Sequence, residues 1–167
     1  MSGDTVPRDT VPVDTVQAAL AAEHAAVWAY DLASAFVTGS AASQLRDAAS
    51  VHQARRDATQ RLLADAGTRP VPPEPGYLTP EPVTDTASAV RLAITVETDV
   101  AGAWRAVLER SAPGPATRGP TIRGPALQSP TIRALALNAL VDSAVRASRW
   151  RASAGITPVT VPFPGTG

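Results

Sequence analysis

Cysteine is absent from the 167-residue chain, and histidine occurs only at His24 and His52. The absence of cysteine excludes disulfides, thiolate zinc sites, iron–sulfur clusters and cysteine nucleophiles. Two histidines are also too few for one chain to build a metal site from three imidazoles. Lysine is missing as well, and all 15 basic residues are arginine. Together with abundant alanine, proline and glycine, this usage is typical of a bacterium with a GC-rich genome.

An excess of charge and a long apolar run are lacking too. The 15 acidic residues balance the 15 basic ones to a formal net charge of zero, so no overall charge attracts nucleic acid or an anionic membrane. No segment approaches the roughly 18 consecutive apolar residues that span a bilayer, and the first residues do not resemble a signal peptide. We therefore expect a cytoplasmic protein with neither nucleic acid nor membrane as a partner.

Proline and glycine divide the rest of the chain into four long helical segments. Favourable N-terminal residues stand at Asp14, Asp85 and Ser129, and Gly67 follows the second segment as a helix stop. The second segment starts at residue 40 or 42, so only a short connection separates it from the first, which indicates an antiparallel pair. Helices are predicted over about 14–38, 40–66, 85–111 and 129–155.

Six prolines between Pro70 and Pro82 exclude helix and central strand from the long connection between the second and third segments. Such a connection is typical of a crossover along the side of a bundle. The sequence thus predicts an all-α, antiparallel four-helix bundle over 14–154 with a Pro-rich crossover. Residues 1–13 are expected to form a flexible arm and 155–167 an extended tail. A repeated "PTIR" phrase at 120–123 and 130–133 indicates a local duplication in the last loop, and the alternative is a short repeated binding motif.

Three of the four segments carry a polar residue on an otherwise apolar stripe. At about 100° per residue, Glu23 falls on the inward stripe of the first helix, His52 and Arg56 on that of the second, and Glu97 on that of the third. A lone buried carboxylate costs several kcal/mol unless it is paired. We therefore predict one shared polar cluster of four residues. His24 is rotated away from Glu23 and is expected at a flank or in solvent. The members of the predicted cluster are Glu23, His52, Arg56 and Glu97.

The fourth segment follows a different pattern, because it holds neither glutamate nor histidine. Its apolar face is predicted to consist of Leu137, Val141, Ala144, Val145 and Ser148. Asp142 and Arg146 fall on the polar side at the spacing of a helix-surface ion pair.

The phrases "LAAEHAAVWAYDL", "HQARRDATQRLL", "PVTDTASAVRLAITVETDVAGAWRAVL" and "ALNALVDSAVRASRWR" resemble the ferritin-like superfamily, and within it a ferritin-like family of unknown function from GC-rich bacteria. The metal-binding members place a Glu on two helices and a Glu-x-x-His on the other two. The resemblance implies that Glu23, Glu97 and His52 occupy ligand positions. The Glu expected before His52 is Ala49, and the Glu-x-x-His of the last helix is missing.

Two functions are compatible with these departures. In the favoured interpretation the di-metal site is degenerate, and Arg56 supplies the positive charge that a metal would bring. The protein is then expected to be a non-enzymatic structural or interaction module without cofactor or catalytic residues, with a second copy of itself or an unknown protein as its partner. The alternative is a metal-binding protein or metal-dependent oxidoreductase that holds iron or manganese with Glu23, His52 and Glu97. A weaker possibility is a small-ligand pocket in which Arg56 binds a carboxylate or phosphate.

Overall fold

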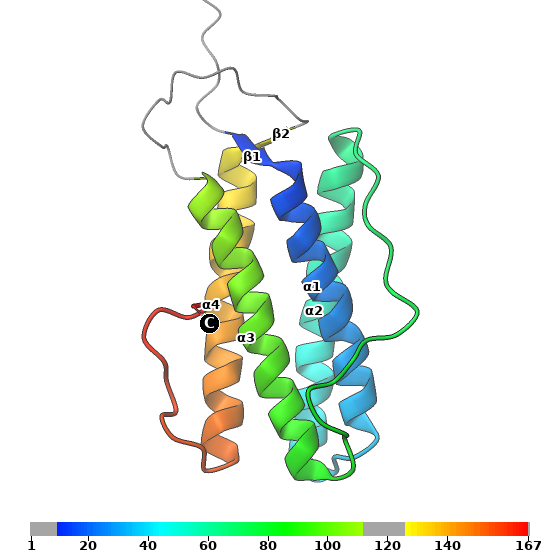
Figure 1. The fold of residues 1–167 in the computed structure, drawn as a ribbon, viewed down its shortest axis with the longest axis vertical. Helices are drawn as coiled ribbons and strands as arrows, with labels where there is room; N and C mark the ends of the chain where they lie inside the picture. Colours follow the sequence, from blue (N-terminus) through cyan, green and yellow to red (C-terminus); the bar gives the residue numbers. More distant parts are fainter. Residues whose placement is uncertain (1–9, 112–125, 167) are drawn as a thin grey trace, which may run out of the picture.

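The described part of the chain, residues 10–111 and 126–166 of a computed structural model, is all-α, as the sequence predicts. It contains four helices and two short strands. Figure 1 shows the helices side by side with their axes nearly aligned. The elements are β1 (Thr10–Pro12), α1 (Val13–Ser34), α2 (Gly39–Asp65), α3 (Thr86–Ser111), β2 (Ala126–Gln128) and α4 (Ser129–Ser153).

The connections determine the direction of each helix. The short turn after α1 reverses the chain, so α1 and α2 are antiparallel (Figure 1). Residues 66–85 then run without helix along the side of the molecule to the opposite end. As a result α3 points in the same direction as α2, and α4 in the same direction as α1. Within the described ranges, no helix is both long enough and apolar enough to cross a membrane.

Part of the predicted N-terminal arm is a strand. β1 pairs antiparallel with β2, and Val11 stands opposite Leu127. Both side chains are buried, which ties this end of the chain to the core. Asp14 is not the N-cap that the sequence predicts. The helix begins one residue earlier, after Pro12, and Asp14 lies in the first turn, where a negative charge still favours the helix dipole.

The predicted caps at Asp85 and Gly67 are confirmed, whereas Ser129, also predicted as a cap, is the first residue of α4. The Asp85 carboxylate accepts a hydrogen bond from the backbone N–H of Ser88 at 2.8 Å, at the start of α3. At the end of α2, Gly67 has a φ of 72°, and the backbone N–H of Thr68 donates to the carbonyl of Leu63. This is the Schellman arrangement that favours glycine. The first copy of the repeated PTIR phrase lies outside the described residues, and the second forms the first turn of α4.

The predicted apolar face of α4 is wrong by about one residue. Leu137, Val141 and Val145 are 53%, 52% and 43% exposed. The buried side is richer in small residues, and one residue of rotation is 100°. Small side chains let two helices approach closely, so alanines rather than the larger Leu and Val face α3. The buried positions are Ile132, Ala136, Ala139, Ser143, Ala147 and Trp150.

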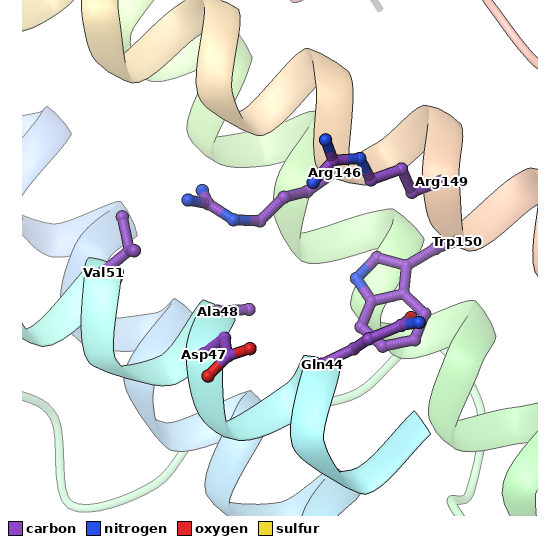
Figure 2. A pocket seen from close by; sticks show the side chains of 7 residues that line it. All are labelled: Gln44, Asp47, Ala48, Val51, Arg146, Arg149 and Trp150. Carbon is purple, nitrogen blue, oxygen red and sulfur yellow. The ribbon is translucent and has the colours of Figure 1, made fainter. Parts of the chain in front are cut away.

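The four helices do not pack against one another equally. α2 packs mainly against α1, and α4 packs mainly against α3, whereas α2 and α4 hardly approach each other. A groove of about 390 Å³ lies between them (Figure 2). The C-terminal tail returns along α4 on the other side (Figure 1). Arg105 on α3 donates to the carbonyl of Phe163 at 3.4 Å, so the predicted tail is docked on the bundle.

Candidate functional site

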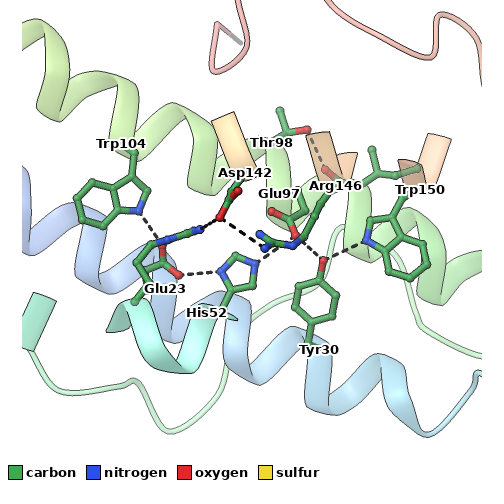
Figure 3. Close-up of polar contacts among 11 residues, drawn as sticks. Glu23, Tyr30, His52, Glu97, Thr98, Trp104, Asp142, Arg146 and Trp150 are labelled. Atoms are coloured by element: carbon green, nitrogen blue, oxygen red, sulfur yellow. Dashed lines mark hydrogen bonds and ion pairs between the residues drawn. The ribbon is translucent and has the colours of Figure 1, made fainter. Parts of the chain in front are cut away.

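Three of the four residues predicted to form the polar cluster meet in the middle of the bundle. Glu23 on α1, His52 on α2 and Glu97 on α3 are each fully buried. His52 Nδ1 lies 2.7 Å from Glu23 Oε2, and His52 Nε2 lies 3.2 Å from Glu97 Oε1. Figure 3 shows the imidazole between the two carboxylates. A histidine donates from both ring nitrogens only as an imidazolium, so this geometry favours a protonated His52.

The pKa directions agree with that geometry. Burial by itself lowers the pKa of His52, but the hydrogen bonds and charges of Glu23 and Glu97 outweigh it and raise the pKa above its usual value. Burial by itself raises the pKa of Glu23, and contacts with His52, Arg55 and Trp104 outweigh it and lower that pKa. Both directions favour the charged forms, an imidazolium for His52 and a carboxylate for Glu23.

Arg55, and not the predicted Arg56, is the arginine of this cluster. Its Nη1 donates to Glu23 Oε1 at 3.1 Å, and its Nη2 donates to Asp142 Oδ2 on α4 at 3.2 Å. Arg56 pairs with the neighbouring Asp57, and its side chain is 27% exposed against 6% for Arg55. Residues three and four positions after His52 lie about 60° and 40° from it on opposite sides. A single helical wheel therefore does not decide which of them faces the cluster.

Three aromatic side chains complete the cluster as hydrogen-bond donors. Tyr30 Oη donates to Glu97 Oε1 at 2.6 Å, and Trp104 Nε1 donates to Glu23 Oε1 at 2.6 Å. Trp150 Nε1 donates to Tyr30 Oη at 3.1 Å. Burial, and then the Glu97 carboxylate, raise the pKa of Tyr30 well above its usual value.

The apolar stripes do not identify these aromatics as members of the polar cluster, although the spacing of two of them carries a signal. Tyr30 follows Glu23 by seven residues, and Trp104 follows Glu97 by seven. Seven residues are two turns on one face of a helix. Because α1 and α3 run in opposite directions, each aromatic reaches the carboxylate of the other helix.

α4 contributes a further ion pair at the edge of the cluster. Arg146 Nη2 lies 3.6 Å from Asp142 Oδ2, and the guanidinium extends toward His52 and Tyr30 (Figure 3). With His52 protonated, three carboxylates face two guanidiniums and one imidazolium, and the charges balance. Three buried atoms have no hydrogen-bond partner among the described residues: Glu97 Oε2, Ser143 Oγ and Arg146 Nη1.

The donors in this cluster do not fit a resident metal ion. A metal ligand must present a lone pair, and a histidine that ligates a metal must be neutral at the coordinating nitrogen. Here both ring nitrogens of His52 face carboxylates, and Arg55 holds Glu23 from the other side. Across residues 10–111 and 126–166, no three side chains of His, Cys, Asp or Glu are arranged to hold a metal.

His24 lies apart from the cluster and is not in solvent. Its side chain is buried under the segment between α2 and α3, and its Nε2 lies 3.1 Å from the carbonyl oxygen of Val71. Burial, more than any other cause, lowers the pKa of His24. The sequence did not predict that the crossing segment covers this side of α1.

The described residues define an all-α protein whose four helices surround a polar cluster with Glu23, His52 and Glu97 buried at its centre. Residues 15–167 match the family described as "Domain of unknown function (DUF4439)", and the chain belongs to this family. It is similar in structure to a conserved hypothetical protein, rv2844, from Mycobacterium tuberculosis. The two are 34% identical with a TM-score of 0.72, over 91% of this chain and 96% of the other. No curated protein matches the chain. These matches assign no specific function.

Proposed function

We propose that the chain is a ferritin-like four-helix bundle in which ion pairs replace the dinuclear metal centre, and that it acts as a non-enzymatic structural or interaction module. The directions of the helices support the ferritin-like part of the proposal. A bundle of this class has one long crossover connection, and residues 66–85 run the length of the molecule between α2 and α3 (Figure 1).

The positions of the charged residues support the same relation. In the metal-binding bundles, two helices each give one Glu and the other two each give a Glu-x-x-His. Glu23 and Glu97 take the single positions on α1 and α3. On α2 the paired positions hold His52-x-x-Arg55, and on α4 they hold Ser143-x-x-Arg146. The resemblance in sequence aligns His52 with the His of the Glu-x-x-His motif, whereas this pairing aligns His52 with the Glu of that motif.

The position of His52 between Glu23 and Glu97 carries the proposal. In a dinuclear site, the two carboxylates would bind metal cations, and incoming ligands would bind the same cations. Here an imidazolium and the Arg55 guanidinium take that charge-compensating role, and the fixed positive charges repel a metal cation. The cluster joins all four helices, so its role is to hold the bundle together in one arrangement.

A second copy of the chain is the partner that we propose for the interaction role. Leu137, Val141 and Val145 are exposed at four-residue spacing and form one stripe on α4. A row of exposed apolar side chains favours association. A two-fold interface needs only one such patch, because the same patch serves both subunits.

The alternative function is a metal-binding protein or oxidoreductase that uses iron or manganese. The meeting of Glu23, His52 and Glu97 at one place favours it. In this alternative, His52 has to lose a proton and Glu23 has to give up its ion pair with Arg55. Each change costs free energy that metal binding would have to offset.

Metal content separates the two functions. Wild-type protein, purified without chelator and incubated with ferrous iron or manganese, is expected to retain no metal after desalting. A variant that restores both pairs (His52→Glu, Arg55→His, Ser143→Glu, Arg146→His) is expected to retain about two ions per chain. The control carries Gln53→Glu and Arg61→His on the exposed side of α2.

Two results would contradict the proposal. About one or two ions retained by the wild type would support the alternative function. A restored variant that keeps its helical circular dichroism and binds no metal would show that the six positions do not correspond to the dinuclear site. The wild-type result stands even where the restored variant fails to fold.

A further inference from the structure

The groove between α2 and α4 is lined by Arg149, which lies outside the polar cluster, and by Arg146, which lies at the edge of the cluster. Arg146 and Arg149 extend over it from α4, and Asp47 and Gln44 rise from α2 on the opposite side (Figure 2). Ala48, Val51 and Trp150 line the remainder. The volume of about 390 Å³ lies within the range of small-molecule sites. The groove thus has a cationic side, a side with hydrogen-bond acceptors, and apolar surface between them.

The two arginines retain hydrogen-bonding capacity. No carboxylate within the described part of the chain lies within ion-pair distance of Arg149, which is exposed. Arg146 is 3.6 Å from Asp142, beyond hydrogen-bond length, and its Nη1 has no partner among the described residues. A guanidinium offers five N–H donors in a planar fork that matches a carboxylate. One anionic group between these side chains would supply the missing acceptors.

The charges that line the groove favour a particular ligand. Arg146 and Arg149 give two positive charges and Asp47 gives one negative charge, so the lining has a net charge of +1. A carboxylate carries one negative charge at neutral pH, whereas a phosphate monoester carries between about 1.5 and 2. Asp47 repels the second charge of a phosphate, and it accepts a hydrogen bond from an amine or hydroxyl.

We propose that this groove binds a small carboxylate that carries an amine or hydroxyl donor at its other end. The arginines hold the carboxylate, Asp47 receives the donor, and the apolar surface contacts the carbon skeleton between them. The site lies outside the Glu23–His52–Glu97 contacts. It shares Arg146 and Trp150 with the edge of the polar cluster, whereas Arg149 and Asp47 lie outside the cluster, so variants at these two positions test the groove separately from the core.

Titration by NMR tests the site with 6-aminohexanoate, hexanoate, hexylamine and inorganic phosphate at constant ionic strength. The indole N–H signal of Trp150, assigned with Trp150→Phe, reports binding. We expect 6-aminohexanoate and hexanoate to shift this signal, 6-aminohexanoate at the lower concentration, and the other two probes to leave it unchanged. Arg149→Gln is expected to weaken binding about tenfold. Arg61→Gln, an exposed arginine of α2 away from the groove, is expected to change it less than about twofold.

Asp47→Asn tests the orientation of the ligand. It removes the negative charge, so hexanoate is expected to bind more tightly and 6-aminohexanoate to lose its advantage. The proposal is overturned by no shift with either carboxylate, by a response to phosphate or hexylamine alone, or by equal effects of Arg149→Gln and Arg61→Gln. If Arg149→Gln loses binding and Asp47→Asn has no effect, the proposed contact between Asp47 and the amine or hydroxyl of the ligand is overturned.

Discussion

Arg55 and Arg56 are neighbours in sequence with different surroundings. Arg55 joins Glu23 on α1 to Asp142 on α4, and Arg56 contacts only the adjacent Asp57 among ion-pair partners in the described structure. Arg55→Met is expected to destabilise the protein by about 3 kcal/mol, because it leaves buried Glu23 without one of its cations. Arg56→Met, the matched control, is expected to cost less than about 1 kcal/mol. Urea unfolding measures both, and equal costs would mean that Arg55 is not part of the core.

The protonation of His52 predicts how stability depends on pH. Its pKa is raised in the folded state, so its contribution is complete below the usual value of 6.5 and is lost as pH rises through the folded pKa. Glu23, Glu97, Arg55 and Arg146 are the charged groups around it. The free energy of unfolding is therefore expected to fall as pH increases above about 6.5.

The comparison with His52→Gln isolates this effect. In the variant, chemical unfolding between pH 6 and 9 is expected to show a flatter dependence on pH. His24 acts in a different range, since its pKa is lowered in the fold and its contribution is lost as pH falls below 6.5. An equally steep decline in His52→Gln would show that another group carries the pH dependence.

At the scale of the elements, the ends of the helices depend on a few residues. Gly67 has a φ of 72°, a region that strains other residues. Gly67→Ala is expected to lower the stability by about 1 kcal/mol. Gly76→Ala is the control, because a Cβ there meets open space and its φ is not in that region. Thermal unfolding compares them, and no difference between the two variants would argue against the Schellman arrangement at the end of α2.

The helices themselves can be predicted from the sequence because proline, glycine and capping residues mark their ends. Asp85 and Gly67 are such signals, and both act in the structure as local chemistry requires. The strand pair β1–β2 cannot be predicted in this way. It joins residues far apart in sequence, and each strand has only three residues, too few to show an alternating pattern.

The faces of the helices are predictable only where the stripe is distinctive. Glu23 and Glu97 stand among larger apolar residues at regular spacing, and both are buried. In the middle of α4, Leu137, Val141 and Val145 lie outside and alanines lie inside, so hydrophobicity alone selects the wrong face. The helical wheel selects Arg56 instead of Arg55 for a related reason, because it does not show which neighbouring helix offers a carboxylate.

At the scale of the whole molecule, the exposed stripe of α4 predicts self-association. Val141 lies at its centre between Leu137 and Val145. We expect the wild type to sediment as a dimer and Val141→Glu as a monomer, because the interface would bury the new charge against its own copy. The control variant Asn138→Glu adds the same charge to α4 beside the stripe. A monomeric wild type, or a dimer that survives Val141→Glu, would contradict the proposed interface.

The central claim is that an imidazolium, not a metal, holds the two carboxylates in the core of the bundle. The ¹⁵N signals of the His52 ring test this most directly, and they can be assigned with His52→Gln and His24→Gln because the chain has only two histidines. At pH 7 and with added Zn²⁺, we predict two protonated ring nitrogens whose signals do not change. One unprotonated ring nitrogen that shifts when Zn²⁺ is added would contradict the account.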